Sequence, residues 1–121
     1  MRKKILVIDD EKDIVKLLES RLKANHYEVV TAFDGEEGLE KLKKEKPDLV
    51  ILDIFMPKTD GYTFVRECKT IVDIKSVPII VLTAKERMRD LFKMEGVADY
   101  ILKPFMAEEL LEKVNKHIGP A

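Results

Sequence analysis

The chain has 121 residues, of which 45% are hydrophobic, and its 22 basic and 23 acidic side chains give a formal net charge of −1. That length and composition suit one compact domain and exclude a disordered or collagen-like chain. The near-zero charge argues against a nucleic-acid binder, which would be basic. No apolar run is long enough for a signal peptide core or a membrane span, and the single cysteine, Cys68, allows no intrachain disulfide, so we expect a cytoplasmic protein.

Five short apolar runs, mostly β-branched, alternate along the chain with segments of helical period. Runs that are continuously apolar, rather than alternating with polar residues, are typical of strands covered on both faces of a parallel sheet. The predicted strands are residues 5–8, 29–32, 49–52, 78–82 and 100–102.

Each predicted strand is followed by apolar side chains at helical spacing. The second such segment opens with Asp34, and Glu37 follows three residues later, as in a capping box. The five apolar stripes are Ile14, Leu17, Leu18 and Leu22; Leu39 and Leu42; Phe64, Val65, Cys68, Ile71 and Val72; Met88, Leu91 and Phe92; and Leu110, Leu111, Val114 and Ile118.

Strands that alternate with helices predict an α/β fold built from βαβ units. Right-handed crossovers place helices on both faces and produce a doubly wound parallel sheet. With five strands, the flavodoxin-like order 2-1-3-4-5 is the leading topology. We treat residues 1–121 as a single domain, because the sequence contains no linker, repeat or low-complexity segment.

Polar residues follow four of the predicted strands at the point where each strand ends. The carboxyl ends of parallel strands meet at one edge of the sheet, and ligands bind at that edge in such folds. The residues concerned are Asp9, Asp10 and Glu11 after the first strand, Asp53 after the third, Thr83 after the fourth and Lys103 after the fifth.

This set of side chains predicts magnesium-dependent phosphoryl transfer onto a carboxylate. Crowded carboxylates repel one another unless a cation lies between them, and oxygen ligands without His or Cys favour Mg²⁺ or a similar ion such as Mn²⁺. A lysine and a hydroxyl group suit the charged oxygens of a transferring phosphoryl group. An Asp carboxylate can itself be the nucleophile.

Five short motifs carry a family resemblance, although none of them is specific alone. Together, in this order and at this spacing, they make the whole chain resemble the receiver domain of two-component response regulators, such as the chemotaxis regulators. The motifs are VIDD at 7–10, DLVILD at 48–53, MP at 56–57 with DG at 60–61, VLTA at 81–84 and YILKPF at 100–105.

The resemblance implies a metal site around Asp53, which would also accept the phosphoryl group as an aspartyl phosphate. Asp10 would be a direct ligand of the metal ion, and Asp9 would hold a metal-bound water. The backbone carbonyl of Phe55 would supply a further ligand, so the identity of its side chain matters little for coordination.

The resemblance also implies roles for residues of the last two strands. Lys103 would pair with the phosphoryl group, and Thr83 would hydrogen-bond one of its oxygens. Tyr100 matches the family's switch aromatic, whose ring position is coupled to movement of that threonine. The peptide bond from Lys103 to Pro104 would be cis, as an X-Pro bond permits.

By the same resemblance, the phosphodonor would be a phosphohistidine of a sensor histidine kinase or of a phosphotransfer protein. The surface around the first predicted helix and Phe105 would meet the kinase. The domain would catalyse its own phosphorylation and dephosphorylation without a separate turnover substrate, so we do not expect an enzyme in the usual sense. Output would be contact with a downstream protein or a missing effector domain, with no direct contact to nucleic acid or membrane.

One departure from the family pattern concerns the stretch from Thr83 to Lys103, which is slightly shorter than usual. The shortening falls in the fourth predicted helix or in the loop before it. In the family, that helix is part of the output and dimerisation face, so the family's dimer contacts are not carried over here.

Three other functions fit parts of the pattern. A flavodoxin-like electron carrier shares the fold class, but a loop that begins Asp9-Asp10-Glu11 would repel a flavin phosphate. A phosphatase with an Asp nucleophile resembles a pattern with a second Asp two residues later, where this chain has Phe55. A receiver-like interaction module that works without phosphorylation remains an alternative, and the intact acidic residues, threonine and lysine argue against it.

Simpler structural roles are also open to residues of this chain. Asp9 and Asp10 could cap the first helix, and Tyr100 could be strand packing. We expect His26 and His117, which have no partner pattern, to be surface residues. We expect Cys68 to lie in the core, because it sits on an apolar helical stripe.

Overall fold

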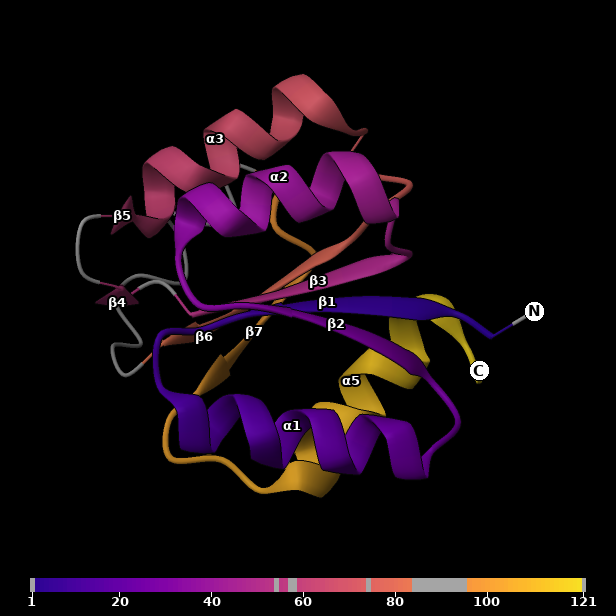
Figure 1. Cartoon of the computed structure of the whole chain (residues 1–121). Helices are drawn as coiled ribbons and strands as arrows, with labels where there is room; N and C mark the ends of the chain where they lie inside the picture. The colour runs from indigo at the N-terminus through magenta and orange to yellow at the C-terminus, as the bar shows by residue number, and fades with distance from the viewer. Residues whose placement is uncertain (1, 54, 57–58, 74, 84–95, 121) are drawn as a thin grey trace.

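The computed structural model describes residues 2–53, 55–56, 59–73, 75–83 and 96–120, and these form one parallel sheet between two layers of helices (Figure 1). The strands lie in the order β2-β1-β3-β6-β7, which confirms the predicted order 2-1-3-4-5 of a doubly wound fold. The strands of this sheet are β1 (Lys4–Ile8), β2 (Glu28–Ala32), β3 (Leu49–Asp53), β6 (Ile79–Thr83) and β7 (Asp99–Leu102).

The helices divide between the two faces of the sheet. Helices α1 (Lys12–Ala24) and α5 (Ala107–Ile118) cover one face, and α2 (Gly35–Glu45) and α3 (Gly61–Ile71) cover the other (Figure 1). The fourth predicted helix, with Met88, Leu91 and Phe92, lies outside the described residues. Within the described ranges, no helix is long and apolar enough to cross a bilayer.

The central strands are buried on both sides, which explains their continuous apolar sequences. In β1, Leu6 and Ile8 pack into the core under α2 and α3, whereas Ile5 and Val7 pack into the core over α1 and α5. All four side chains are fully buried. Because burying one such side chain stabilises a fold by about 1.5–3 kcal/mol, these strands supply much of the stability of the domain.

Helix α2 begins as its sequence predicts. The Asp34 side chain accepts a hydrogen bond from the Glu37 amide at 2.8 Å. The Glu37 carboxylate accepts a return hydrogen bond from the Phe33 amide at 2.9 Å, one residue earlier than in a regular capping box. The reciprocal bonds fix the point at which the chain leaves β2.

The structure corrects three details of the sequence interpretation. Leu17, which was placed in the first apolar stripe, is 44% exposed, and Val15 takes the buried position instead. The chain also forms a short antiparallel pair, β4 (Phe55–Met56) with β5 (Thr59–Asp60). Strands of two residues are too short to produce a recognisable sequence pattern, so this pair was not predicted. Asp53 and Thr83 are the last residues of their strands rather than the first residues after them.

Gly38 brings α2 unusually close to the sheet. A Cβ atom at this position would lie 2.7 Å from Cδ1 of Ile8 and 3.3 Å from Cζ of Phe64. Both neighbouring side chains are fully buried, so they have little room to move.

We therefore predict that Gly38→Ala lowers the free energy of unfolding by about 1–3 kcal/mol, because overpacking outweighs the higher helix propensity of alanine. Urea denaturation would measure the change. Glu40→Ala, on the exposed side of the same helix, is the control and should be close to wild type. A Gly38→Ala protein as stable as that control would contradict the close approach.

Candidate functional site

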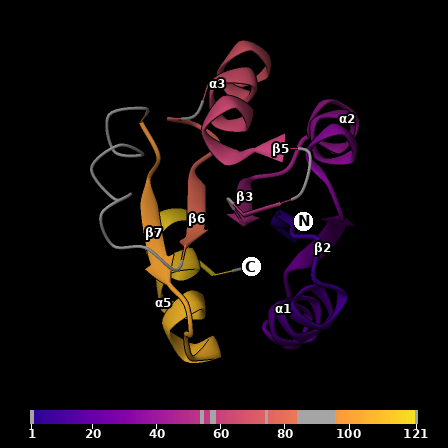
Figure 2. The same cartoon turned by 90° about the vertical axis from the view of Figure 1, so that its left-hand side faces the viewer.

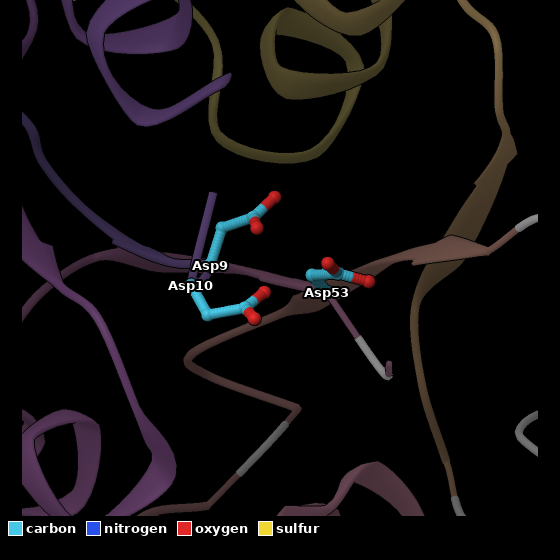
Figure 3. A group of neighbouring side chains, drawn as sticks. All are labelled: Asp9, Asp10 and Asp53. Carbon is cyan, nitrogen blue, oxygen red and sulfur yellow. The ribbon is translucent and has the colours of Figure 1, made fainter. Parts of the chain in front are cut away.

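The candidate site lies at the carboxyl edge of the sheet, which faces the viewer in Figure 2. Asp9 and Asp10 directly follow β1, and Asp53 ends the neighbouring strand β3. Each of the three aspartates offers one carboxylate oxygen, and these oxygens all lie within 4.8 Å of one another (Figure 3). The structure therefore brings the adjacent residues Asp9 and Asp10 together with Asp53, which lies more than 40 residues later in the sequence.

The sheet ladder fixes the backbone on both sides of the site. The Asp9 amide donates to the Ala32 carbonyl at 3.1 Å, which continues the pairing of β1 with β2. The Lys103 amide donates to the Thr83 carbonyl at 2.8 Å, which continues the pairing of β7 with β6. Both residues are thus held in place by the regular strands that precede them.

Lys103 supplies a positive charge to the acidic cluster. Its Nζ atom lies 3.1 Å from Oδ2 of Asp53 and 3.8 Å from Oδ2 of Asp9. When fully ionised, the three carboxylates and this ammonium group together keep two uncompensated negative charges. A divalent cation would neutralise them.

Asp9 is the most constrained acid of the cluster. Its Oδ1 atom accepts a hydrogen bond from the Glu11 amide at 2.9 Å, and its fully buried Oδ2 atom has no hydrogen-bond partner. Burial raises the pKa of Asp9 to about 7; the Glu11 amide and Lys103 oppose that shift, while the neighbouring Asp53 adds to it. A buried carboxyl oxygen without a hydrogen bond is costly, and such a group in a cluster of oxygens suits a hard cation such as Mg²⁺.

The simple capping role for the aspartate pair is not observed. Glu11 occupies the N-cap position of α1, and its side chain makes no capping hydrogen bond. Asp9 binds the Glu11 amide, which lies before the first helical turn, and leaves its second oxygen facing the cluster. The metal-site interpretation accounts for that second oxygen, whereas capping does not.

The other expected site residues lie on β4, β6 and β7 or directly after β7. Thr83 is 1% exposed and ends β6, the strand next to Asp53. The Lys103–Pro104 peptide bond is cis, in agreement with the expectation. Phe55 begins β4 two residues after Asp53, and the ligand role of its carbonyl stays a prediction. Tyr100, partly buried, pairs with Val81 on the neighbouring strand.

One polar cluster was missed by the sequence interpretation. His117, which was expected to be a free surface residue, lies 3.0 Å from the Asp99 carboxylate, and Lys113 binds the same carboxylate at 2.9 Å. The i, i+4 spacing of Lys113 and His117 puts them on one face of α5, which was the available signal. His26 is exposed, and Cys68 is fully buried, as predicted.

The fold and the acidic edge together define the class of α/β signalling domains that includes the chemotaxis regulators. The solved structure of the chemotaxis response regulator CheY4 of Vibrio cholerae matches with a TM-score of 0.91 and 32% identity, over 98% of this chain and 100% of that chain. The family model of the response regulator receiver domain matches residues 5–115.

The chain belongs to the response regulator receiver domain family, whose general function is that of a phosphorylation switch in two-component signalling. It is 46% identical over 117 residues to the alkaline phosphatase synthesis transcriptional regulatory protein PhoP of Bacillus subtilis (strain 168), covering 94% of this chain and 48% of that protein. It is 48% identical over 115 residues to the probable transcriptional regulator ycf27 of Cyanophora paradoxa, covering 93% and 47%. The chain thus spans about half the length of these curated relatives.

The raised pKa of Asp9 predicts how metal-free stability depends on pH. The folded state holds a proton on Asp9 up to a pH of about 7, whereas the unfolded chain loses it near 3.8, so the stabilisation present at low pH is lost as the pH rises through this window. We predict that Asp9→Asn removes this loss. The free energy of unfolding of the variant, relative to that of wild type, should rise by roughly 1–3 kcal/mol from pH 5 to pH 8.

Urea denaturation in EDTA at both pH values would measure this gain. Asp13→Asn, an exposed acid in the first turn of α1, is the matched control and should show no such pH dependence. If the Asp9→Asn protein and wild type differed by the same amount at both pH values, the assignment of the raised pKa to Asp9 would be wrong.

Proposed function

We propose that the chain is a switch in which Asp53 accepts a phosphoryl group from a phosphohistidine of a sensor histidine kinase or phosphotransfer protein, in a reaction that needs Mg²⁺ or Mn²⁺. The observation that carries this proposal is the convergence of Asp9, Asp10 and Lys103 on Asp53 at the carboxyl edge of the sheet. We further propose that residues 1–121 act as one receiver domain in the cytoplasm.

Asp53 is the proposed nucleophile because of its position and its neighbours. One carboxylate oxygen would form a bond to phosphorus as the bond from phosphorus to the donor imidazole nitrogen breaks. Lys103, 3.1 Å from Oδ2 of Asp53, would bind an oxygen of the phosphoryl group once it is transferred. The product is the modified domain itself, so no separate turnover substrate is proposed.

Asp9, Asp10 and Asp53 would hold the metal ion, with the Phe55 carbonyl as a further ligand. When bound, the ion would neutralise charge on the phosphoryl oxygens. Asp10 is more exposed than the other two acids, so it can bind an ion that arrives from solvent and keeps several waters. Asp9, buried behind it, would hold one of those waters through its second oxygen.

Thr83 and Tyr100 are the proposed read-out residues. Thr83 would donate its hydroxyl group to a phosphoryl oxygen on Asp53 of the adjacent strand. In the sheet register Tyr100 pairs with Val81 and Leu102 with Thr83, so Tyr100 and Thr83 are diagonal neighbours on one face. A movement of Thr83 would therefore change the space available to the Tyr100 ring.

A groove beside the site is the proposed docking surface for the kinase. It has a volume of about 450 Å³ and is lined mainly by apolar side chains of α1 and of the chain after β7: Ile14, Leu17, Lys103, Pro104 and Phe105. Leu17 is 44% exposed, and Met106, the residue after Phe105, is 69% exposed. Apolar side chains held in water next to a reactive group suit a partner that covers them during transfer.

The switched surface would act on an effector. The curated relatives are named as transcriptional regulators and are about twice as long as this chain. We propose a DNA-binding effector as the partner of the phosphorylated domain, with no direct contact between residues 1–121 and DNA. The net charge of −1 supports that last point.

We predict that acetyl phosphate with Mg²⁺ adds one phosphoryl group to the chain, at Asp53. Intact-mass spectrometry before and after treatment would measure the addition. A parallel sample treated with acetyl phosphate in EDTA would show whether the addition needs a divalent ion. Asp53→Asn should lose it completely, whereas the matched control Asp13→Asn should keep it. Uptake that persists in Asp53→Asn, or that needs no divalent ion, would overturn the assignment.

The docking surface makes a separate prediction. Leu17→Glu should slow transfer from an autophosphorylated sensor kinase that acts on the wild-type chain by about tenfold or more, because the charge would be buried in the interface. Its uptake from acetyl phosphate should stay at the wild-type rate, since the chemistry at Asp53 does not involve Leu17. Equal slowing with both donors would place the defect in the site rather than in docking. The control is Ser20→Glu, an exposed position further along α1.

A further inference from the structure

A second polar cluster joins the start of β7 to α5. The Asp99 Oδ1 atom accepts hydrogen bonds from Lys113 Nζ and from the Tyr100 amide, each at 2.9 Å. Its Oδ2 atom lies 3.0 Å from Nε2 of His117. The side chains of Asp99, Lys113 and His117 are 12%, 28% and 19% exposed, so this cluster is largely sheltered from water.

Asp99 is a firm anchor for the Lys113 ammonium group. Burial raises the pKa of Asp99, but the hydrogen bonds from His117, Lys113 and the Tyr100 amide outweigh that effect, so its pKa lies below the usual value. The carboxylate therefore stays charged across the neutral range. An ammonium group at 2.9 Å from a sheltered carboxylate has much less positional freedom than a lysine in water.

The anchored ammonium group also faces an aromatic ring. Lys113 Nζ lies 5.9 Å from the centre of the Tyr100 ring, within the range of an attractive cation–ring contact. Such contacts change an equilibrium constant about two- to fivefold at partly exposed sites. One lysine thus contacts both the residue before the ring and the ring itself.

The position of this contact gives it a direction. Tyr100 lies diagonally opposite Thr83, which ends β6 at the site, whereas Asp99 pairs with Ile80 further from the carboxyl end. β7 is an edge strand of the sheet and Thr83 lies on its neighbour β6, whereas Lys113 lies on helix α5. A ring that turned toward Thr83 on β6 would leave its present contact with the ammonium group on α5.

We propose that Lys113, anchored by Asp99, is a positioning residue that holds the Tyr100 ring at the edge of the sheet and so favours the unphosphorylated arrangement. This inference rests on the proposed function, in which the ring follows Thr83 after phosphorylation. By linkage, a contact that favours the unphosphorylated state weakens binding of a phosphoryl group at Asp53 by the same factor. His117 supports the anchor from the other carboxylate oxygen.

The test uses Lys113→Met, which keeps the apolar stem and removes the charge. The protein is labelled with 3-fluorotyrosine, and the Tyr100 signal is assigned with Tyr100→Phe among the three tyrosines. Beryllofluoride with Mg²⁺ serves as the phosphoryl probe. We expect the unliganded Tyr100 signal of Lys113→Met to shift toward its beryllofluoride-bound position, and half-saturation to need about two- to fivefold less beryllofluoride.

Two variants separate positioning from other effects. Lys116→Met removes an exposed positive charge from the same turn of α5 and should match wild type in both measurements. Lys113→Arg keeps the charge beside Asp99 and the ring, and should restore the wild-type signal and half-saturation. The fluorine signal reports the ring itself, which a general loss of stability would not shift toward the bound position.

Each outcome decides the inference. If Lys113→Met matches Lys116→Met in both measurements, or if Lys113→Arg fails to restore wild-type behaviour, the positioning role is overturned while the proposed function stands. If wild type does not bind beryllofluoride, the proposed function is overturned and this inference with it. A shifted Tyr100 signal together with tighter binding, present only in Lys113→Met, supports the positioning role.

Discussion

The sheet holds three mutually repelling carboxylates together at its carboxyl edge, and this repulsion is the constraint that the rest of the structure has to balance. Within the described part of the chain, one ammonium group, Lys103, opposes them, and one buried oxygen of Asp9 has no hydrogen bond. A fold does not gain stability from such an arrangement, because unpaired buried charge is costly. The arrangement suits the proposed function, because binding of a cation and of a phosphoryl group would relieve the repulsion among the carboxylates.

That repulsion requires a strong scaffold. The strands β1, β3 and β6 are buried on both faces, and their apolar side chains fill two separate cores. Close contacts such as that between Gly38 and Ile8 leave the layers little room to relax around the charged edge. The pairing of the backbone therefore holds the three carboxylates close together against their mutual repulsion.

Much of this structure could be predicted from the sequence. The strands could be predicted from continuous apolar runs, and their order from the handedness of the crossovers. The candidate site residues could be predicted from the polar residues at the strand ends. The sequence could not decide between Val15 and Leu17, because both are apolar and the face of α1 is set by packing against the sheet. The partner of His117 could not be found either, because Asp99 lies on a different element 18 residues earlier, and only the fold brings them together. The two-residue strands β4 and β5 are too short to produce any periodic pattern.

The amides of Asp9 and Lys103 both extend the ladder of the sheet beyond the last regular residue of their strands. Hydrogen bonds of the sheet therefore hold the backbone on two sides of the site. In the proposed switch, the side chains of Thr83 and Tyr100 would move on strands whose backbones are paired with each other. The outer surface of β7 and α5 can then diverge in sequence to suit new partners, while the frame that holds the acids is left unchanged.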